Sequence, residues 1–182
     1  LPAGGFRRCG LRRVVGRAAV LRNCGAVLRA HGEEMAQRSA LERGKPRARA
    51  RAEVSESANR CDWYADHGPA MLSSEPTRVE NHRATIEYRP LGAILAIMPW
   101  NFPIWQVLRG AVPALLARNT DVLKHAPTVM RRAYLIGEAF ERAGFPVVVF
   151  QLTHLAHYLC SAAISDHRTV ASPVTSVVRA VA

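Results

Sequence analysis

"LGAILAIMPWNFPIWQVLRGAVPALLARNTDVLKH", residues 91–125, places a short apolar run before a segment with helical spacing and a second strand-like stretch after it. Residues 91–98 are continuously apolar, which is typical of a parallel strand that is buried on both faces. Residues 103–117 carry apolar side chains at helical spacing, and residues 121–125 form a second short strand. A strand, a helix and a strand in this order predict a parallel α/β sheet.

The same rhythm continues toward the C-terminus. Residues 128–143 predict a second helix that ends at Gly144, and "VVVF" (147–150) predicts a third strand. No GxGxxG follows the first strand, so the ordinary dinucleotide fingerprint is missing. We expect the α/β fold class, with N-terminal helices followed by part of a Rossmann-like, doubly wound parallel sheet.

The first half of the chain has a different pattern. Helical spacing predicts helices over residues 11–28, over residues 33–43, and from about Pro46 past a break or kink at Gly68–Pro69. Residues 77–89 alternate between polar and apolar positions, as in a half-exposed strand. We therefore divide the chain into a helical segment (1–76), a bridging strand segment (77–89) and a partial α/β domain (90–182).

Composition fits one globular domain, or one domain with an added lobe: 182 residues, 49% hydrophobic and 21% charged. No apolar run approaches the roughly 20 residues that a membrane-spanning helix needs. Most of the net charge of +11 lies in residues 1–60, which hold 14 Lys and Arg against 5 Glu. A nucleic-acid- or membrane-binding module is the alternative function. We favour an arginine-rich solvated helical surface, with no nucleic-acid or membrane partner, because no zinc spacing or aromatic–basic interleaving accompanies the charge.

The cysteines and the N-terminus give weaker signals. Residues 1–32 contain no acid, as in organelle transit peptides, but a piece of a longer protein explains the start at Leu1 equally well. The four cysteines follow no CxxC or metal spacing, which indicates reduced thiols, a cytoplasmic location and no metal site: Cys9, Cys24, Cys61 and Cys160.

A site is expected where the predicted strands end, because ligands bind at the carboxyl ends of open parallel sheets. Met98 to Phe102 follow the first strand, and Lys124 and His125 close the second, so both clusters fall on one edge. Asn101 either caps the helix that begins near Pro103 or offers its amide to a developing oxyanion. Lys124 is either solvated or bound to a ligand.

Residues 88–127, "YRPLGAILAIMPWNFPIWQVLRGAVPALLARNTDVLKHAP", resemble the cofactor-domain segment of aldehyde dehydrogenases, and upstream "EEMAQ", "ERGKP" and "CDWYADHGPAML" extend the likeness. Within that family the chain is most similar to the bacterial succinate-semialdehyde dehydrogenases. The resemblance implies NAD- or NADP-dependent oxidation of succinate semialdehyde to succinate, by an enzyme that is a homo-oligomer in the intact family.

The resemblance also implies roles for single residues. Asn101 is the amide donor to the oxyanion that forms when the family's cysteine attacks the aldehyde. Arg109, eight residues later, faces the substrate tunnel and could hold the distal carboxylate by charge-assisted bonds. Phe102 and Gln106 contact the substrate beside it. Lys124 bonds the adenosine ribose, and the other implied cofactor contacts, Asn101 included, are Ile97, Met98, Pro99, Trp100, His125, Ala126 and Pro127.

The chain departs from the family in several places. Family members are well over twice as long, and their nucleophilic cysteine and general-base glutamate match nothing here. Their phosphate-contacting Gly-Ser pair falls on Ser176 and Val177, and Arg118 replaces the glycine of a Gly-Asn turn. We therefore predict a truncated fragment without turnover.

A further departure concerns the coenzyme. NAD-restricted relatives carry a glutamate three residues after the ribose lysine, where this chain has Pro127. Lys124 and His125 add potential positive charge nearby. The sequence therefore predicts that NADP is accepted at least as well as NAD.

Overall fold

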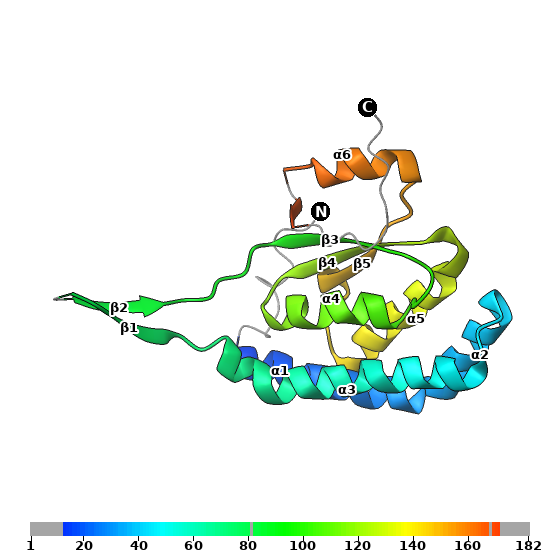
Figure 1. The fold of residues 1–182 in the computed structure, drawn as a ribbon, viewed down its shortest axis with the longest axis horizontal. Coiled ribbons are helices and arrows are strands. Elements are labelled where there is room, and N and C mark those ends of the chain that lie inside the picture. The colour runs from blue at the N-terminus through cyan, green and yellow to red at the C-terminus, as the bar shows by residue number, and fades with distance from the viewer. Residues whose placement is uncertain (1–12, 81, 168, 172–182) are drawn as a thin grey trace.

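The computed structural model describes residues 13–80, 82–167 and 169–171, which form an α/β fold with helices on both faces of a parallel sheet (Figure 1). The first half contains α1 (Val14–Ala30), α2 (Gly32–Arg43), α3 (Arg47–Met71), β1 (Glu75–Val79) and β2 (His82–Ile86). The second half contains β3 (Ala93–Met98), α4 (Trp105–Leu116), β4 (Thr120–His125), η2 (Pro127–Val129), α5 (Met130–Ala143), η3 (Val147–Val149), β5 (Phe150–Leu152), η4 (His157–Leu159), α6 (Cys160–Ile164) and β6 (Thr169–Ala171). The helices expected from the spacing of apolar residues are confirmed.

The sheet has the strand order β5-β4-β3-β6, and all its described pairings are parallel. The order reverses at β3, because the chain first adds β4 and β5 on one side of it and then crosses back to add β6 on the other. Side chains of one face pack with α4 and α5, while Leu95, Ile97 and Val122 pack with Cys160 of α6 on the other. This is the doubly wound arrangement that the sequence predicts.

Helices α1 and α3 lie outside α4 and α5 and share one apolar core with them (Figure 1). Leu21 and Leu28 of α1 are fully buried in that core. Helix α3 approaches α4 closely at Gly68, where an added Cβ would lie only 2.0 Å from a methyl carbon of Leu116. Of the break or kink expected at Gly68–Pro69, the break is wrong, because α3 continues through Pro69 to Met71. No described helix combines the length and the apolar character that crossing a bilayer requires.

Strands β1 and β2 pair as a two-stranded antiparallel hairpin that projects from the body of the molecule (Figure 1). The single strand expected over residues 77–89 is therefore wrong. Polar and apolar residues alternate in the sequence of β2, which indicated a strand there. The sequence of β1 contains Pro76 and shows no such alternation. All residues of the two strands except Ala84 are exposed, so no burial pattern marks β1 in the sequence.

The third predicted strand also begins later than expected. Residues Val147–Val149 form a short 3-10 turn that the amide of Val149 closes on the carbonyl of Pro146. Strand β5 starts at Phe150 and pairs with β4 from Asp121 to Leu123. The run of valines predicted a strand over residues 147–150, but the three valines after Pro146 form a turn instead.

The turn before β4 ties the two central strands together. Arg118 adopts a left-handed conformation with φ of 68°, which costs energy for any residue with a Cβ. The Oδ1 of Asn119 accepts hydrogen bonds from the amides of Leu91 (2.7 Å) and Gly92 (3.0 Å). Asn119 thus fixes the start of β3 against the start of β4, while Arg118 stands where the resemblance implies a glycine.

Asp121 is an unusual residue in the centre of this sheet. Its side chain is buried in β4, and neither carboxylate oxygen has a hydrogen-bond partner among the described residues. Burial raises the pKa of the carboxyl from 3.8 to about 7. The folded protein therefore keeps a proton on Asp121 that the unfolded chain has already released.

We expect Asp121→Asn to remove a pH dependence of stability. Because the folded pKa lies above the unfolded one, the free energy of unfolding falls as pH rises from about 4 to about 7, by up to about 4 kcal/mol, and then levels off. Urea unfolding at pH 4.5, 6 and 8 would show this fall in the parent and its loss in Asp121→Asn. Glu141→Gln, at an exposed carboxyl on α5, serves as the control. The same slope in Asp121→Asn and the parent would contradict the prediction.

Candidate functional site

The two predicted clusters meet at the carboxyl edge of the sheet. Met98 is the register partner of His125, and Ile97 is the partner of Lys124, so the ends of β3 and β4 lie side by side. Successive residues of a strand point to opposite faces. Met98 belongs to the core on the α4 and α5 side, and Ile97 packs on the α6 side. The predicted shared edge is confirmed.

Residues 99–104, which we call the site loop, connect β3 to α4 and carry Asn101. Asn101 is exposed, and its side-chain amide makes no hydrogen bond to another described residue. The interpretation of Asn101 as a helix cap is wrong, because α4 begins at Trp105 and Ile104 occupies the capping position. The amide is left available for a ligand.

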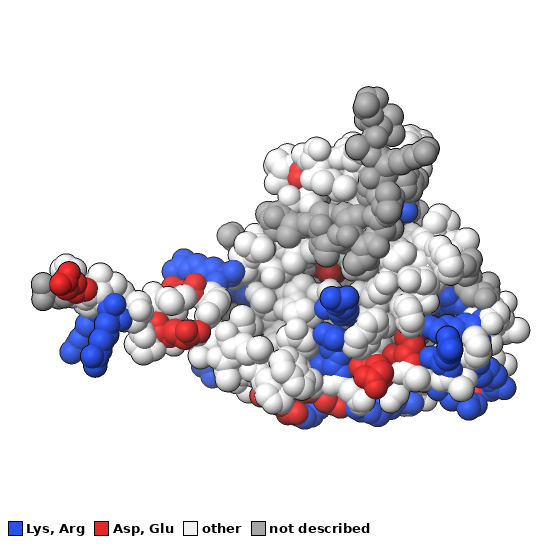
Figure 2. Space-filling view, viewed as in Figure 1, with Lys and Arg blue, Asp and Glu red and all other residues white. Residues whose placement is uncertain are grey.

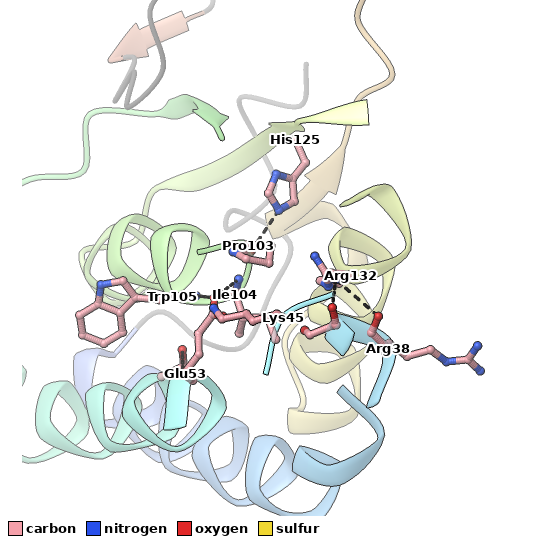
Figure 3. A network of polar contacts seen from close by, with 10 residues as sticks. Arg38, Lys45, Glu53, Pro103, Ile104, Trp105, His125 and Arg132 are labelled. Carbon is pink, nitrogen blue, oxygen red and sulfur yellow. Dashed lines mark hydrogen bonds and ion pairs between the residues drawn. The ribbon is translucent and has the colours of Figure 1, made fainter. Parts of the chain in front are cut away.

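The cap of α4 comes from another helix. Glu53 of α3 is only 5% exposed, and its Oε1 accepts hydrogen bonds from the amides of Ile104 (2.8 Å) and Trp105 (3.0 Å) (Figure 3). Its other oxygen pairs with the ammonium of Lys45. A carboxylate at this position satisfies amides that lack partners within the helix and interacts favourably with the helix dipole.

His125 holds the same loop from the sheet side (Figure 3). Its ring is 2% exposed; the amide of Ala126 donates to Nδ1 (3.0 Å), and Nε2–H donates to the carbonyl of Pro103 (3.0 Å). Burial lowers the pKa of the ring, although its contacts with backbone carbonyls act in the opposite direction. The expectation that His125 adds positive charge is therefore wrong, because burial keeps the pKa of the ring below its usual value and the imidazole is neutral at pH 7.

Lys124 shares the opposite face of the sheet with Val122, on the side covered by α6. It is 6% exposed, and no ion pair joins it to another described residue. Pro127, three residues later, is the exposed first residue of η2 and carries no charge. An ammonium at the carboxyl edge of the sheet can donate hydrogen bonds to a ligand with acceptor oxygens. Ser176 and Val177 lie outside the described residues.

Two adjoining grooves run between α3 and the start of α4. Their volumes are about 320 and 410 Å³, and both are lined by Glu56 and Trp105. The smaller is also lined by Arg49, Ala52, Glu53 and Phe102, and the larger by Asn59, Arg60, Trp63 and Tyr64. The guanidinium carbon of Arg60 stands 4.3 Å from the centre of the Trp105 ring.

The predicted substrate residues lie unequally with respect to these grooves. Phe102 lines the smaller one, while Gln106 is half-buried with an Oε1 that has no hydrogen-bond partner in the described part of the chain. Arg109 is exposed and follows Trp105 by four residues, which places both on one side of α4. The structure thus brings Phe102 into a groove and places Arg109 one turn further along the helix.

Sequence reasoning missed Glu53 and Lys45. Within α3 the buried positions follow helical spacing, and Glu53 is the one charged residue among them: Ala50, Glu53, Val54, Ser57, Ala58, Cys61, Ala65 and Gly68. A carboxylate on an otherwise apolar and small-residue stripe must have a partner, because an unpaired buried charge is costly. That signal was present in the sequence, but its partner was not identifiable from it.

The arginine-rich helices do not present an unbroken basic face. Arg22 pairs with Asp66 (2.5 Å), Arg51 pairs with Glu33 (2.6 Å), and Arg29 pairs with Asp62. Figure 2 shows basic and acidic side chains mixed along the lower part of the molecule, over the helical layer. These three arginines are therefore paired with carboxylates of neighbouring helices.

The described cysteines do not offer a nucleophile at this site. Cys24, Cys61 and Cys160 are free thiols and fully buried, and Cys9 lies outside the described residues. Within residues 13–80, 82–167 and 169–171, no three His, Cys, Asp or Glu side chains gather as metal ligands do.

Comparison with known proteins relates this site to a family. Residues 5–174 match the model of the aldehyde dehydrogenase family. The chain is 56% identical over 180 residues to the NAD(P)+ succinate semialdehyde dehydrogenase Sad of Escherichia coli strain K12, covering 99% of this chain and 39% of that protein. It is 41% identical over 155 residues to a probable NADP+ succinate-semialdehyde dehydrogenase of Synechocystis, covering 85% of this chain and 34% of that protein.

A solved structure agrees with these matches. The succinic semialdehyde dehydrogenase of Streptococcus pyogenes in complex with NADP+ superposes with a TM-score of 0.85 at 29% identity, covering 91% of this chain and 36% of that one. The chain thus spans about two fifths or less of the length of these relatives. Because the family match extends over nearly the whole sequence and over the sheet that carries Asn101 and Lys124, the chain belongs to the aldehyde dehydrogenase family.

Proposed function

We propose that this chain supplies the oxyanion-donor part of an NAD- or NADP-dependent dehydrogenase that oxidises succinate semialdehyde to succinate. The observation that carries the proposal is the position of Asn101: an exposed, unengaged amide on a loop fixed at the carboxyl edge of the sheet. Relatives of this chain are succinate-semialdehyde dehydrogenases by name. The nucleophile and the general base would come from the part of the enzyme that this chain does not span.

Each residue of the site has a separate task in this proposal. The Asn101 amide donates to the oxygen on which negative charge develops, a stabilisation that works best from a preorganised donor. Lys124 donates to the ribose hydroxyls of the cofactor, and its burial without an ion pair supports this role. When bound, NAD or NADP supplies the acceptor for hydride.

The β1–β2 hairpin and the thiols support two further parts of the proposal. An isolated two-stranded hairpin is at best marginally stable in water, yet this one exposes Val79 and Ile86, and Tyr88 just after it is exposed as well. Contact with a second copy of the enzyme would cover these side chains, so we propose a homo-oligomer. Free buried thiols at Cys24, Cys61 and Cys160 support a reducing, cytoplasmic setting. The division of the chain into 1–76, 77–89 and 90–182 stays a prediction.

The 182-residue chain alone should show no turnover of succinate semialdehyde with NAD or NADP, followed by absorbance of the reduced cofactor. An oxyanion donor acts only after a nucleophile has generated the charge. A chimera in which this chain replaces the matching part of the Escherichia coli relative should be active, and Asn101→Ala should lower its kcat by about 10²–10³-fold. Full activity of that variant would contradict the proposal.

Arg109 should determine the preference for an acidic aldehyde. In the same chimera, Arg109→Ala should raise KM for succinate semialdehyde far more than for an uncharged aldehyde of similar length. The lost charge-assisted bonds are worth about 1.5–3 kcal/mol. Arg131→Ala, at an exposed arginine of α5, provides the matched control. An equal rise of KM for both aldehydes would show that Arg109 does not bind the carboxylate.

The coenzyme preference should depend on the uncharged residue at position 127. We expect the chimera to use NADP at least as well as NAD, because no carboxylate stands beside the ribose to repel a 2′-phosphate. Pro127→Glu should then raise KM for NADP while leaving KM for NAD within about threefold, and Pro127→Gln controls for the loss of the ring. Strong preference for NAD in the parent chimera would count against this argument.

A further inference from the structure

We propose that Glu53 is a positioning residue of this site: its carboxylate fixes the site loop and thereby aims the Asn101 amide. The proposal rests on the proposed function, and it assigns a task to an α3 residue that does not touch the substrate. Its basis is a set of contacts that hold the loop from three directions while leaving Asn101 exposed.

The first contact is the double hydrogen bond at the start of α4. A single oxygen of Glu53 accepts from the amides of Ile104 (2.8 Å) and Trp105 (3.0 Å), 51 and 52 residues away along the chain. Ile104 stands three residues after Asn101, so the fixed end of the helix is also the fixed end of the loop. Any displacement of this end is passed to the Asn101 backbone through two intervening residues.

The second and third contacts hold the two intervening residues. Lys45 pairs with the other carboxylate oxygen of Glu53 and places its ammonium nitrogen 4.5 Å from the centre of the Phe102 ring. His125 donates from Nε2 to the carbonyl of Pro103. Four consecutive residues, 102 to 105, are therefore each contacted by a side chain from elsewhere in the chain, and Figure 3 shows these contacts for Pro103, Ile104 and Trp105.

The source of the cap explains why Asn101 is free. Asparagine is among the best residues for capping a helix, and one near the start of α4 could have accepted a hydrogen bond from a helix amide with its side-chain oxygen. Glu53 performs this task from α3, which leaves the amide of Asn101 without a structural duty. Burying a carboxylate and an ammonium together is costly, and replacing such a pair by apolar residues is often neutral or stabilising. The Glu53–Lys45 pair therefore needs a reason other than stability, and positioning the site loop provides one.

The first test measures the loop in the 182-residue chain by amide hydrogen exchange. Glu53→Ala should speed exchange at Ile104 and Trp105, while Glu53→Gln, which keeps an acceptor oxygen, should retain most of the protection. Glu56→Ala is the matched control, because Glu56 is exposed, one turn back from Arg60 on α3, and lines the same grooves. Unchanged exchange in Glu53→Ala would overturn the proposal.

The second test is a double-mutant cycle in the active chimera. Glu53→Ala should lower kcat by about tenfold or more with KM for the aldehyde within about twofold, since misplacing a group by about 1 Å can cost as much as 10²-fold. On the Asn101→Ala background the same change should alter kcat by less than about twofold, because the donor it aims is gone. Glu53→Gln should recover most of the activity.

The outcomes separate the two proposals. If Asn101→Ala alone leaves kcat unchanged, the proposed function fails, whatever Glu53 does. If Asn101→Ala lowers kcat but the Glu53 and Asn101 losses multiply, the function stands and the positioning role of Glu53 is overturned. Should Glu53→Ala fail to fold, Glu53→Asp keeps the charge but withdraws the acceptor by one methylene, and the same non-multiplying loss is expected from it.

Discussion

Every other part of the fold depends on the parallel pairing of β3 with β4. Strand β3 is wholly apolar and requires cover on two faces, and β4 is buried along its whole length although it carries several polar residues. Cover on one face comes from α4 and α5, with α1 and α3 packed outside them, and on the other from α6. Because the strands run in the same direction, their carboxyl ends coincide, and that coincidence brings Asn101 and Lys124 to one edge. The packing requirement and the location of the site therefore have a single cause.

The N-terminal helices take part in the site as well as in the core. Glu53 lies on the face of α3 that packs inward, yet its carboxylate reaches the backbone at the start of α4. The grooves beside the site loop are lined by the neighbouring face of the same helix. A helix that packs against the rest of the molecule through its small and apolar residues thus also determines where a loop of the sheet domain stands. The part-buried ion pair between Glu53 and Lys45 lies at this junction.

The sequence predicted the elements that have a regular pattern of residues within a short stretch of the chain. The two buried strands, the helices between them and the shared edge follow from runs and spacings of apolar residues. The hairpin was missed because β1 buries nothing, and the 3-10 turn before β5 was missed because a valine run outweighs Pro146 in any propensity argument. Contacts between distant residues have no local signature. Glu53 is the clearest case, since its partners lie more than 50 residues further along the chain. The neutral state of His125 likewise depends on burial, which the sequence does not specify.

The placement of the aromatic residues gives the molecule a local optical property. Its three tryptophans are Trp63, Trp100 and Trp105. Trp63 and Trp105 line one groove, Trp100 belongs to the site loop, and the Arg60 guanidinium lies over the Trp105 ring. Tryptophan fluorescence therefore comes only from α3, the site loop and the start of α4. Helices α1 and α5 and strand β5 contain no tryptophan. In this protein, intrinsic fluorescence is a signal from one side of the molecule and reports the surroundings of Asn101 rather than the fold as a whole.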